Sequence, residues 1–137
     1  MRPLDEKTLV GGQILPEQMQ DLAAQGVTTL INNRPDFEAP NQPTSADLKT
    51  AAEAAGIAYH HIPVAGGFSQ GQVESMSEAL ASSQGKVVAF CLSGTRSTYL
   101  WALARATQGA DAETLIGQAA AAGYDLRPIA GYLAPRG

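Results

Sequence analysis

Short apolar or β-branched runs alternate with amphipathic helical patterns along almost the whole chain, and this alternation restricts the possible folds. Runs typical of buried strands occupy residues 8–12, 27–33, 57–64 and 86–91. Helical patterns occupy residues 16–26, 45–56, 70–85, 97–107 and 111–123, and residues 126–135 are expected to form a short helix or turn. This alternation predicts a three-layer α/β fold, with helices on both faces of a mostly parallel central sheet. A chain of 137 residues is expected to form one domain, residues 1–137.

The carboxyl ends of the predicted strands indicate where a ligand would bind. In parallel sheets, ligands bind at that edge. Three segments are expected to converge there: residues 32–36, 65–69 and 91–96. The last of these begins with Cys91, the only cysteine of the chain.

The segment from Cys91 to Ser97 joins the last predicted strand to a helix. Backbone N–H groups of this loop, together with the N-terminus of the helix, are expected to surround the sulfur and to stabilise a thiolate. Gly94 supplies the backbone freedom that such a loop requires, and Arg96 offers a planar cationic fork for an oxyanion. We therefore predict Cys91 and Arg96 as catalytic residues. The predicted anion-binding loop comprises Leu92, Ser93, Gly94, Thr95 and Ser97.

The stretch Phe-Cys-Leu-Ser-Gly-Thr-Arg-Ser resembles the catalytic loops of cysteine-dependent protein phosphatases and of rhodanese sulfurtransferases. Phosphatases of that kind place five residues between Cys and Arg, whereas four separate Cys91 from Arg96, a spacing typical of rhodaneses. Single-domain rhodaneses commonly read Cys-Arg-Ser-Gly-x-Arg-Ser. The chain departs from that pattern at Leu92, where one positive charge near the entrance is lost.

Most of the chain, residues 8–124, resembles the phosphatase-like domain family of beta-lactamase-hydrolase-like proteins. The similarity is carried by residues 10–36, 54–64 and 93–103. It implies a protein-tyrosine-phosphatase-like fold of the dual-specificity type. Some members are fused to a metallo-beta-lactamase-like persulfide dioxygenase, which implies a separate persulfide dioxygenase as a partner of this chain.

Two reactions fit a cysteine in such a loop. A phosphatase needs an acid to protonate the leaving oxygen, and dual-specificity phosphatases usually carry it in the loop that corresponds to residues 65–69, where this chain has no carboxylate. Asp36 and Glu38, on another rim loop, are the alternatives, and Phe90 replaces the His that commonly precedes the cysteine. Sulfane transfer requires no proton donor.

The sequence therefore favours a sulfurtransferase that takes sulfane sulfur from thiosulfate or glutathione persulfide as a Cys91 persulfide. The alternative is a cysteine-dependent phosphatase that acts on a small or protein phosphoester through a phosphocysteine. A third hypothesis is a non-catalytic anion-binding or redox-sensing module with a low-pKa thiol. The plainest interpretation of a lone cysteine after an apolar strand is a small buried hydrophobe.

Four further residues are candidates for the rim of the site. Arg34 is predicted to hold an anionic donor and Asn33 to brace the rim, although both also fit a turn network with a surface ion pair. Asp36 is the possible acid, and Phe68 forms either a hydrophobic lip or simple packing. His60 and His61 alternate along a predicted strand and are expected to be structural.

Composition excludes other classes of function. The net charge is −4, with no run of Lys or Arg, which argues against electrostatic binding to nucleic acid or to an anionic membrane. No apolar stretch is long enough for a membrane span or fits a signal peptide. One cysteine and two histidines argue against a structural zinc site. We expect a cytoplasmic protein without cofactor or metal.

Overall fold

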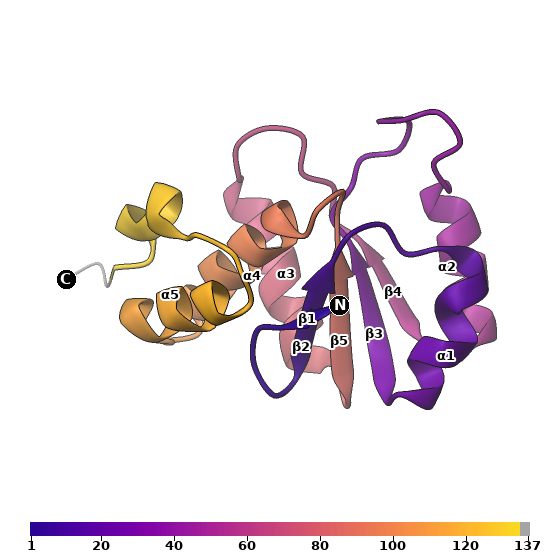
Figure 1. Ribbon diagram of the computed structural model, residues 1–137, viewed down its shortest axis with the longest axis horizontal. Coiled ribbons are helices and arrows are strands. Elements are labelled where there is room, and N and C mark those ends of the chain that lie inside the picture. Colours follow the sequence, from indigo (N-terminus) through magenta and orange to yellow (C-terminus); the bar gives the residue numbers. More distant parts are fainter. Residues whose placement is uncertain (135–137) are drawn as a thin grey trace.

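The computed structural model describes residues 1–134 and contains a five-stranded sheet with helices on both faces (Figure 1). The strands are β1 (Arg2–Pro3), β2 (Thr8–Gly11), β3 (Val27–Asn32), β4 (Ala58–His61) and β5 (Lys86–Phe90). Their order is β1-β2-β5-β3-β4, and only the short β1 runs antiparallel to its neighbour. The predicted α/β class with a mostly parallel sheet is thus confirmed.

The helices follow the sequence patterns closely. They are α1 (Met19–Ala24), α2 (Ser45–Ala54), α3 (Gln70–Ser82), α4 (Thr95–Thr107) and α5 (Ala112–Ala121), with 3₁₀ helices at Pro16–Gln18 and Arg127–Tyr132. Side chains of Thr44, Ser69 and Asp111 accept hydrogen bonds from backbone N–H groups in the first turns of α2, α3 and α5. These caps satisfy N–H groups that have no partner within the helix.

Strand β5 divides the hydrophobic core into two parts. Its side chains point alternately to opposite faces, as a strand requires. Val87 and Ala89 pack on the side covered by α3, α4 and α5, whereas Val88 and Phe90 pack on the side covered by α1 and α2 (Figure 1). All four are fully buried. The segment that leads to Cys91 is therefore the centre of the molecule.

The structure departs from the predicted elements and boundaries in several places. Strand β1 was not predicted, since two residues carry no periodic pattern. The predicted helix 16–26 begins with a 3₁₀ turn, and α4 begins at Thr95 instead of Ser97 because Gly94 serves as its N-cap. The predicted closing segment 126–135 is a 3₁₀ helix from Arg127 to Tyr132, and Pro135 lies outside the described residues. Within residues 1–134, no helix combines the length and apolarity needed to cross a membrane.

Alanine substitutions of Leu30 on β3 and of Leu92 after β5 test the core packing described above. Leu30 is fully buried and Leu92 is 61% exposed. We expect Leu30→Ala to lower the free energy of unfolding by about 2–5 kcal/mol, and Leu92→Ala by no more than about 0.5 kcal/mol. Urea denaturation of both variants measures the difference, and equal losses would contradict the packing described.

Candidate active site

Cys91 directly follows the central strand and is held by both neighbouring strands. Its N–H donates to the carbonyl of Gly11 at the end of β2 (3.3 Å), and the preceding carbonyl of Phe90 accepts from Asn33 N–H after β3 (2.8 Å). Only 1% of Cys91 is exposed. The sulfur therefore has a fixed position at the carboxyl edge of the sheet, at the N-terminal end of α4.

Backbone N–H groups of the loop face this sulfur. The closest contact is from Gly94 N–H to Cys91 Sγ, at 3.1 Å. Burial by itself raises the pKa of Cys91, but the N–H groups of Ser97, Ser93, Gly94 and Arg96 outweigh burial, so that the pKa lies below that of an ordinary thiol. The loop is built to hold a negative charge at Cys91.

Gly94 has the backbone conformation that lets the loop close. Its φ is +96°, in the left-handed region that favours glycine. A Cβ at this position would also overlap the hydroxyl of Tyr124. That hydroxyl donates to the carbonyl of Ser93 at 2.9 Å. Glycine is thus required here for both its conformation and its small size.

Arg96 lies in the first turn of α4, and its guanidinium is held in place by two acceptors. Nη1 and Nη2 donate to the two carboxylate oxygens of Glu38 at 2.8 and 2.9 Å, and Nη1 also donates to the carbonyl of Val64 at 2.8 Å. Glu38 and the Cys91 thiolate both favour the charged guanidinium and raise the pKa of Arg96. Arg96 in turn lowers the pKa of Glu38. Glu38 is therefore an ionised anchor for Arg96, which is the opposite of what a proton donor requires.

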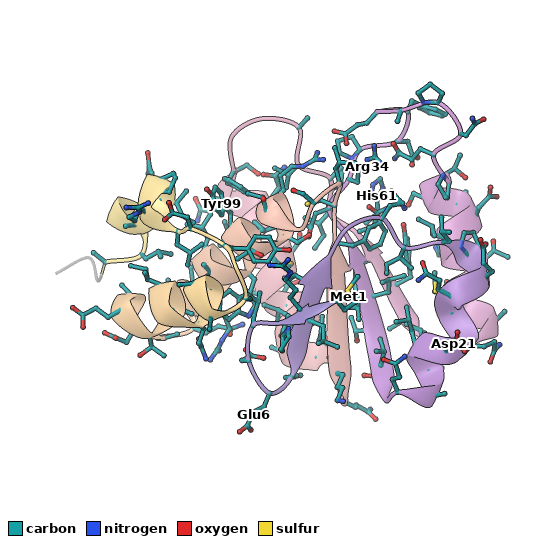
Figure 2. The ribbon with its side chains drawn as sticks, viewed as in Figure 1. Met1, Glu6, Asp21, Arg34, His61 and Tyr99 are labelled. Carbon is teal, nitrogen blue, oxygen red and sulfur yellow. The ribbon has the colours of Figure 1, made fainter. Side chains whose placement is uncertain are left out.

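Arg34 lies at the carboxyl end of the strands, as Figure 2 shows. The residue is nevertheless only 5% exposed, and its side chain makes hydrogen bonds to other side chains of the protein. Its Nε donates to Glu38 (3.0 Å) and its Nη1 to the side-chain oxygen of Gln13 (2.9 Å). The carbonyl of Arg34 accepts a hydrogen bond from His61 Nε2 at 2.9 Å, so that this ring nitrogen carries the proton. Arg34 thus reaches Arg96 only through the carboxylate that they share.

The other predicted rim residues occupy different surroundings. Asn33 is fully buried, and its Nδ2 donates to the carbonyl of Ile62 at 3.0 Å. Asp36 accepts from Ser45 N–H, the first residue of α2, at 2.8 Å. Phe68 lies against Tyr99 of α4, with ring centroids 6.2 Å apart. Of these three, Asn33 alone is bonded to the end of the Cys91 strand.

The loop hydroxyls and Leu92 differ in exposure. Ser93 Oγ donates to Thr95 Oγ1 at 3.1 Å on the exposed side of the loop. Ser97 is fully buried, and its Oγ has no hydrogen-bond partner in the described part of the chain. Leu92, directly after Cys91, is 61% exposed. An apolar side chain thus lies at the surface next to Cys91.

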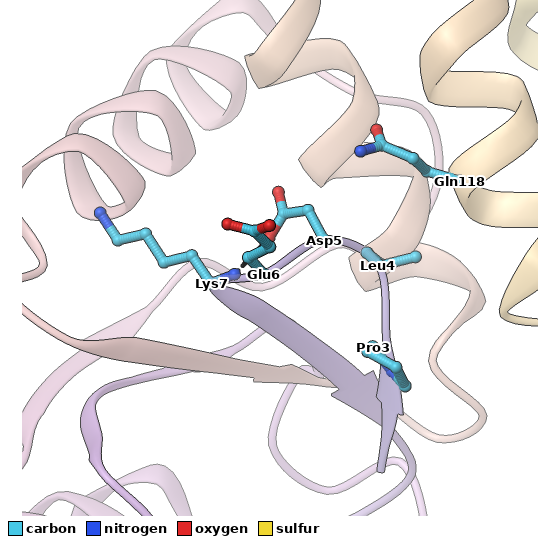
Figure 3. A pocket seen from close by; sticks show the side chains of 6 residues that line it. All are labelled: Pro3, Leu4, Asp5, Glu6, Lys7 and Gln118. Carbon is cyan, nitrogen blue, oxygen red and sulfur yellow. Dashed lines mark hydrogen bonds between the residues drawn. The ribbon is translucent and has the colours of Figure 1, made fainter.

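A hollow elsewhere on the surface has no part in this site. It is lined by Pro3, Leu4, Asp5, Glu6, Lys7 and Gln118 (Figure 3). Most of its lining residues directly precede β2, so the hollow lies at the amino edge of the sheet, opposite Cys91. Asp5 there accepts from the N–H groups of Lys7 and Thr8 at 2.8 and 2.7 Å, which is the bonding of a turn. Within residues 1–134, no three His, Cys, Asp or Glu side chains are grouped as a metal site requires.

The sequence of residues 1–108 matches the model of a family described as beta-lactamase hydrolase-like protein, phosphatase-like domain. The chain belongs to this family. Curated relatives named beta-lactamase hydrolase-like protein occur in Xylella fastidiosa (strain Temecula1), 35% identical, and Agrobacterium fabrum (strain C58), 36% identical. Each match spans 107 residues, which is 77% of this chain and 25% of the relative. The chain thus spans about a quarter of their length.

Solved structures of phosphatase candidates have the same fold. A crystal structure from Neisseria meningitidis Z2491 is 33% identical, with a TM-score of 0.80 over 96% of this chain and 94% of that one. One from Shewanella putrefaciens CN-32 is 24% identical, with a TM-score of 0.70 over 96% and 86%. PTPMT1, at 18% identity and a TM-score of 0.71 over 96% and 90%, shows the fold alone. The predicted protein-tyrosine-phosphatase-like fold is confirmed.

Two residues of this arrangement escaped the sequence-based site prediction. Tyr124 was not predicted at all, and Glu38 was considered only as an acid and not as the anchor of Arg96. Glu38 and Arg96 are 58 positions apart, and Tyr124 and Ser93 are 31 apart. No local pattern in the sequence indicates that these side chains meet.

Substitution of Gly94 tests the geometry of the loop, and Gly109 provides the matched control. Gly109 has nearly the same φ, +95°, but no atom lies within 4 Å of an added Cβ. Alanine costs about 1–2 kcal/mol of backbone strain at either position, while the clash with Tyr124 is confined to Gly94. We expect Gly94→Ala to lower the free energy of unfolding by more than Gly109→Ala does, and to slow alkylation of Cys91. Equal effects of the two variants would argue against the contact.

The ionisation of Cys91 gives a pH-dependent stability. Because its pKa is lower in the folded state than the unfolded value of about 8.5, the thiolate stabilises the fold fully above that unfolded value. The contribution is lost as the pH falls through the folded-state pKa. We expect the difference in unfolding free energy between wild type and Cys91→Ser to grow with pH over this range. A pH-independent difference would contradict a lowered pKa.

Proposed function

We propose that the chain is a cysteine-dependent phosphatase. The observation that carries this proposal is the ring of N–H groups around a buried, ionisable sulfur, with the Arg96 guanidinium anchored beside it. N–H groups and a fixed guanidinium fork stabilise the oxyanions of a phosphoryl group. The family description and the name of the 33% identical structure from Neisseria meningitidis support the same chemistry.

In this reaction Cys91 Sγ⁻ attacks phosphorus and the ester oxygen leaves, which gives a phosphocysteine. Water then attacks phosphorus, the S–P bond breaks, and phosphate and the thiolate are released. Arg96 and the loop N–H groups hold the phosphoryl oxygens through both steps. Glu38 keeps the fork of Arg96 in place, since the carboxylate binds both terminal nitrogens.

We infer that no carboxylate of the described residues protonates the leaving oxygen. Residues 65–69 contain no carboxylate, Glu38 is an ionised anchor, and Asp36 is bonded to the start of α2. We therefore propose substrates whose leaving group departs as an anion, such as aryl or acyl phosphates. Esters of ordinary alcohols need the roughly 10²–10⁴-fold contribution of a general acid.

A series of aryl phosphates with leaving-group pKa values from about 4 to 10 tests this proposal. We expect kcat/KM to fall steeply as the leaving-group pKa rises, and Cys91→Ser to abolish turnover. Asp36→Asn should leave kcat/KM within about twofold of wild type. A flat dependence on leaving group, together with a large loss in Asp36→Asn, would identify Asp36 as a general acid and overturn this part of the proposal.

Sulfane sulfur transfer is the second candidate, favoured by the four-residue spacing between Cys91 and Arg96. The Cys91 thiolate would attack the outer sulfur of thiosulfate, sulfite would leave with the electron pair of the broken S–S bond, and a Cys91 persulfide would remain. A separate persulfide dioxygenase, as partner, belongs to this candidate. The leaving group again needs no proton.

Intact-protein mass after incubation with thiosulfate or glutathione persulfide separates the two candidates. A phosphatase gains no sulfur, whereas a sulfurtransferase gains one sulfur atom that cyanide removes and that Cys91→Ser does not acquire. Phosphate release from aryl phosphates is measured on the same preparation. If phosphate release and sulfur gain are both absent while Cys91 remains reactive to alkylation, the site is a binding or redox module and both candidates fail.

A further inference from the structure

The peptide group between Ser93 and Gly94 makes a hydrogen bond through its N–H and another through its C=O. Its N–H donates to Cys91 Sγ at 3.1 Å, and its carbonyl oxygen accepts from the Tyr124 hydroxyl at 2.9 Å. The C=O and N–H of one peptide lie in a plane and point in opposite directions. A bond that fixes the oxygen therefore also fixes the direction of the N–H toward the sulfur.

Tyr124 is itself held rigidly by the end of α5. Gly123 has φ +93°, Tyr124 N–H donates to the carbonyl of Ala119 (2.8 Å), and Gly123 N–H donates to that of Ala120 (2.9 Å). This is the Schellman arrangement that ends a helix. The Tyr124 ring also packs on the core side of α3, α4 and α5. The hydroxyl thus projects from a fixed backbone.

The space around Gly94 is shaped to admit this hydroxyl. Gly94 is buried, and the missing Cβ is what leaves room for the Tyr124 oxygen. The contact joins the loop to residues beyond position 108, where the match to the family model ends.

We propose that Tyr124 is a positioning residue that holds the Ser93–Gly94 peptide so that Gly94 N–H stabilises the Cys91 thiolate. This inference rests on the proposed role of Cys91 as nucleophile and deepens it. The hydroxyl acts in two ways. It prevents rotation of the peptide away from the sulfur, and it polarises the C=O, which strengthens the N–H as a donor in a hydrogen-bond chain.

The Tyr124→Phe variant removes the hydroxyl and keeps the ring. The alkylation rate of Cys91 by iodoacetamide, measured against pH, reports the fraction of thiolate. We expect the midpoint to rise by about half a unit to one unit, and the rate well below the midpoint to fall roughly three- to tenfold. At alkaline pH, where Cys91 is fully ionised in both proteins, the two alkylation rates should converge.

Tyr132→Phe is the matched control, because Tyr132 is 71% exposed and the same atom is removed. It should leave the midpoint unchanged. Amide hydrogen exchange is a second measurement, in which Gly94 N–H should exchange faster in Tyr124→Phe than in wild type. This measurement keeps the inference testable if the variant also lowers the melting temperature.

An unchanged alkylation midpoint and unchanged exchange at Gly94 in Tyr124→Phe would overturn the inference. The proposed phosphatase function is tested separately, by turnover of aryl phosphates in wild type and Cys91→Ser. If wild type shows no turnover but the midpoint shifts in Tyr124→Phe, the phosphatase proposal fails and the positioning role stands. If turnover depends on Cys91 and the alkylation midpoint does not move in Tyr124→Phe, the phosphatase proposal stands and the positioning role of Tyr124 fails.

Discussion

The site depends on one interaction, the bonding of several backbone N–H groups to a single buried sulfur. A thiol that is 1% exposed would ordinarily be harder to ionise, because charge is costly to bury. Here the N–H groups of Ser93, Gly94, Arg96 and Ser97 provide the solvation that water would supply. Since these groups belong to the backbone, they are fixed by the fold itself, by the end of β5 and the start of α4.

Side chains around the loop hold the guanidinium of Arg96, a charged group that the backbone cannot supply. Glu38 is shared by Arg34 and Arg96, so two arginines and one carboxylate form a connected network at the rim. The Arg96–Glu38 pair is partly exposed, at 24% and 28%, and such pairs contribute little to stability. Its importance lies in orientation. A guanidinium fixed before an anion arrives loses less conformational freedom on binding.

Much of this architecture follows from the sequence. Val87 to Phe90 are all apolar, as is typical of a strand with both faces buried. That run predicts the strand, its end at Cys91 and the edge of the sheet where Cys91 lies. What sequence reasoning missed are contacts between distant segments, such as that of Tyr124 with Ser93, which leave no periodic pattern. The exact start of α4 depends on the left-handed backbone conformation of Gly94. A glycine allows this conformation but does not require it, so the sequence alone does not predict where the helix begins.

The solitary position of Cys91 has a consequence for oxidative damage. Peroxide oxidises a cysteine thiolate to a sulfenic acid. Many enzymes with such thiols protect them by forming a disulfide with a second cysteine, but this chain has only one. An oxidised Cys91 would therefore return to the thiolate with a thiol from outside the chain. Without one, the sulfenic acid is open to condensation with a backbone nitrogen or to further oxidation to the sulfinic state. The supply of small thiols around the protein would then decide how long Cys91 remains reduced under peroxide.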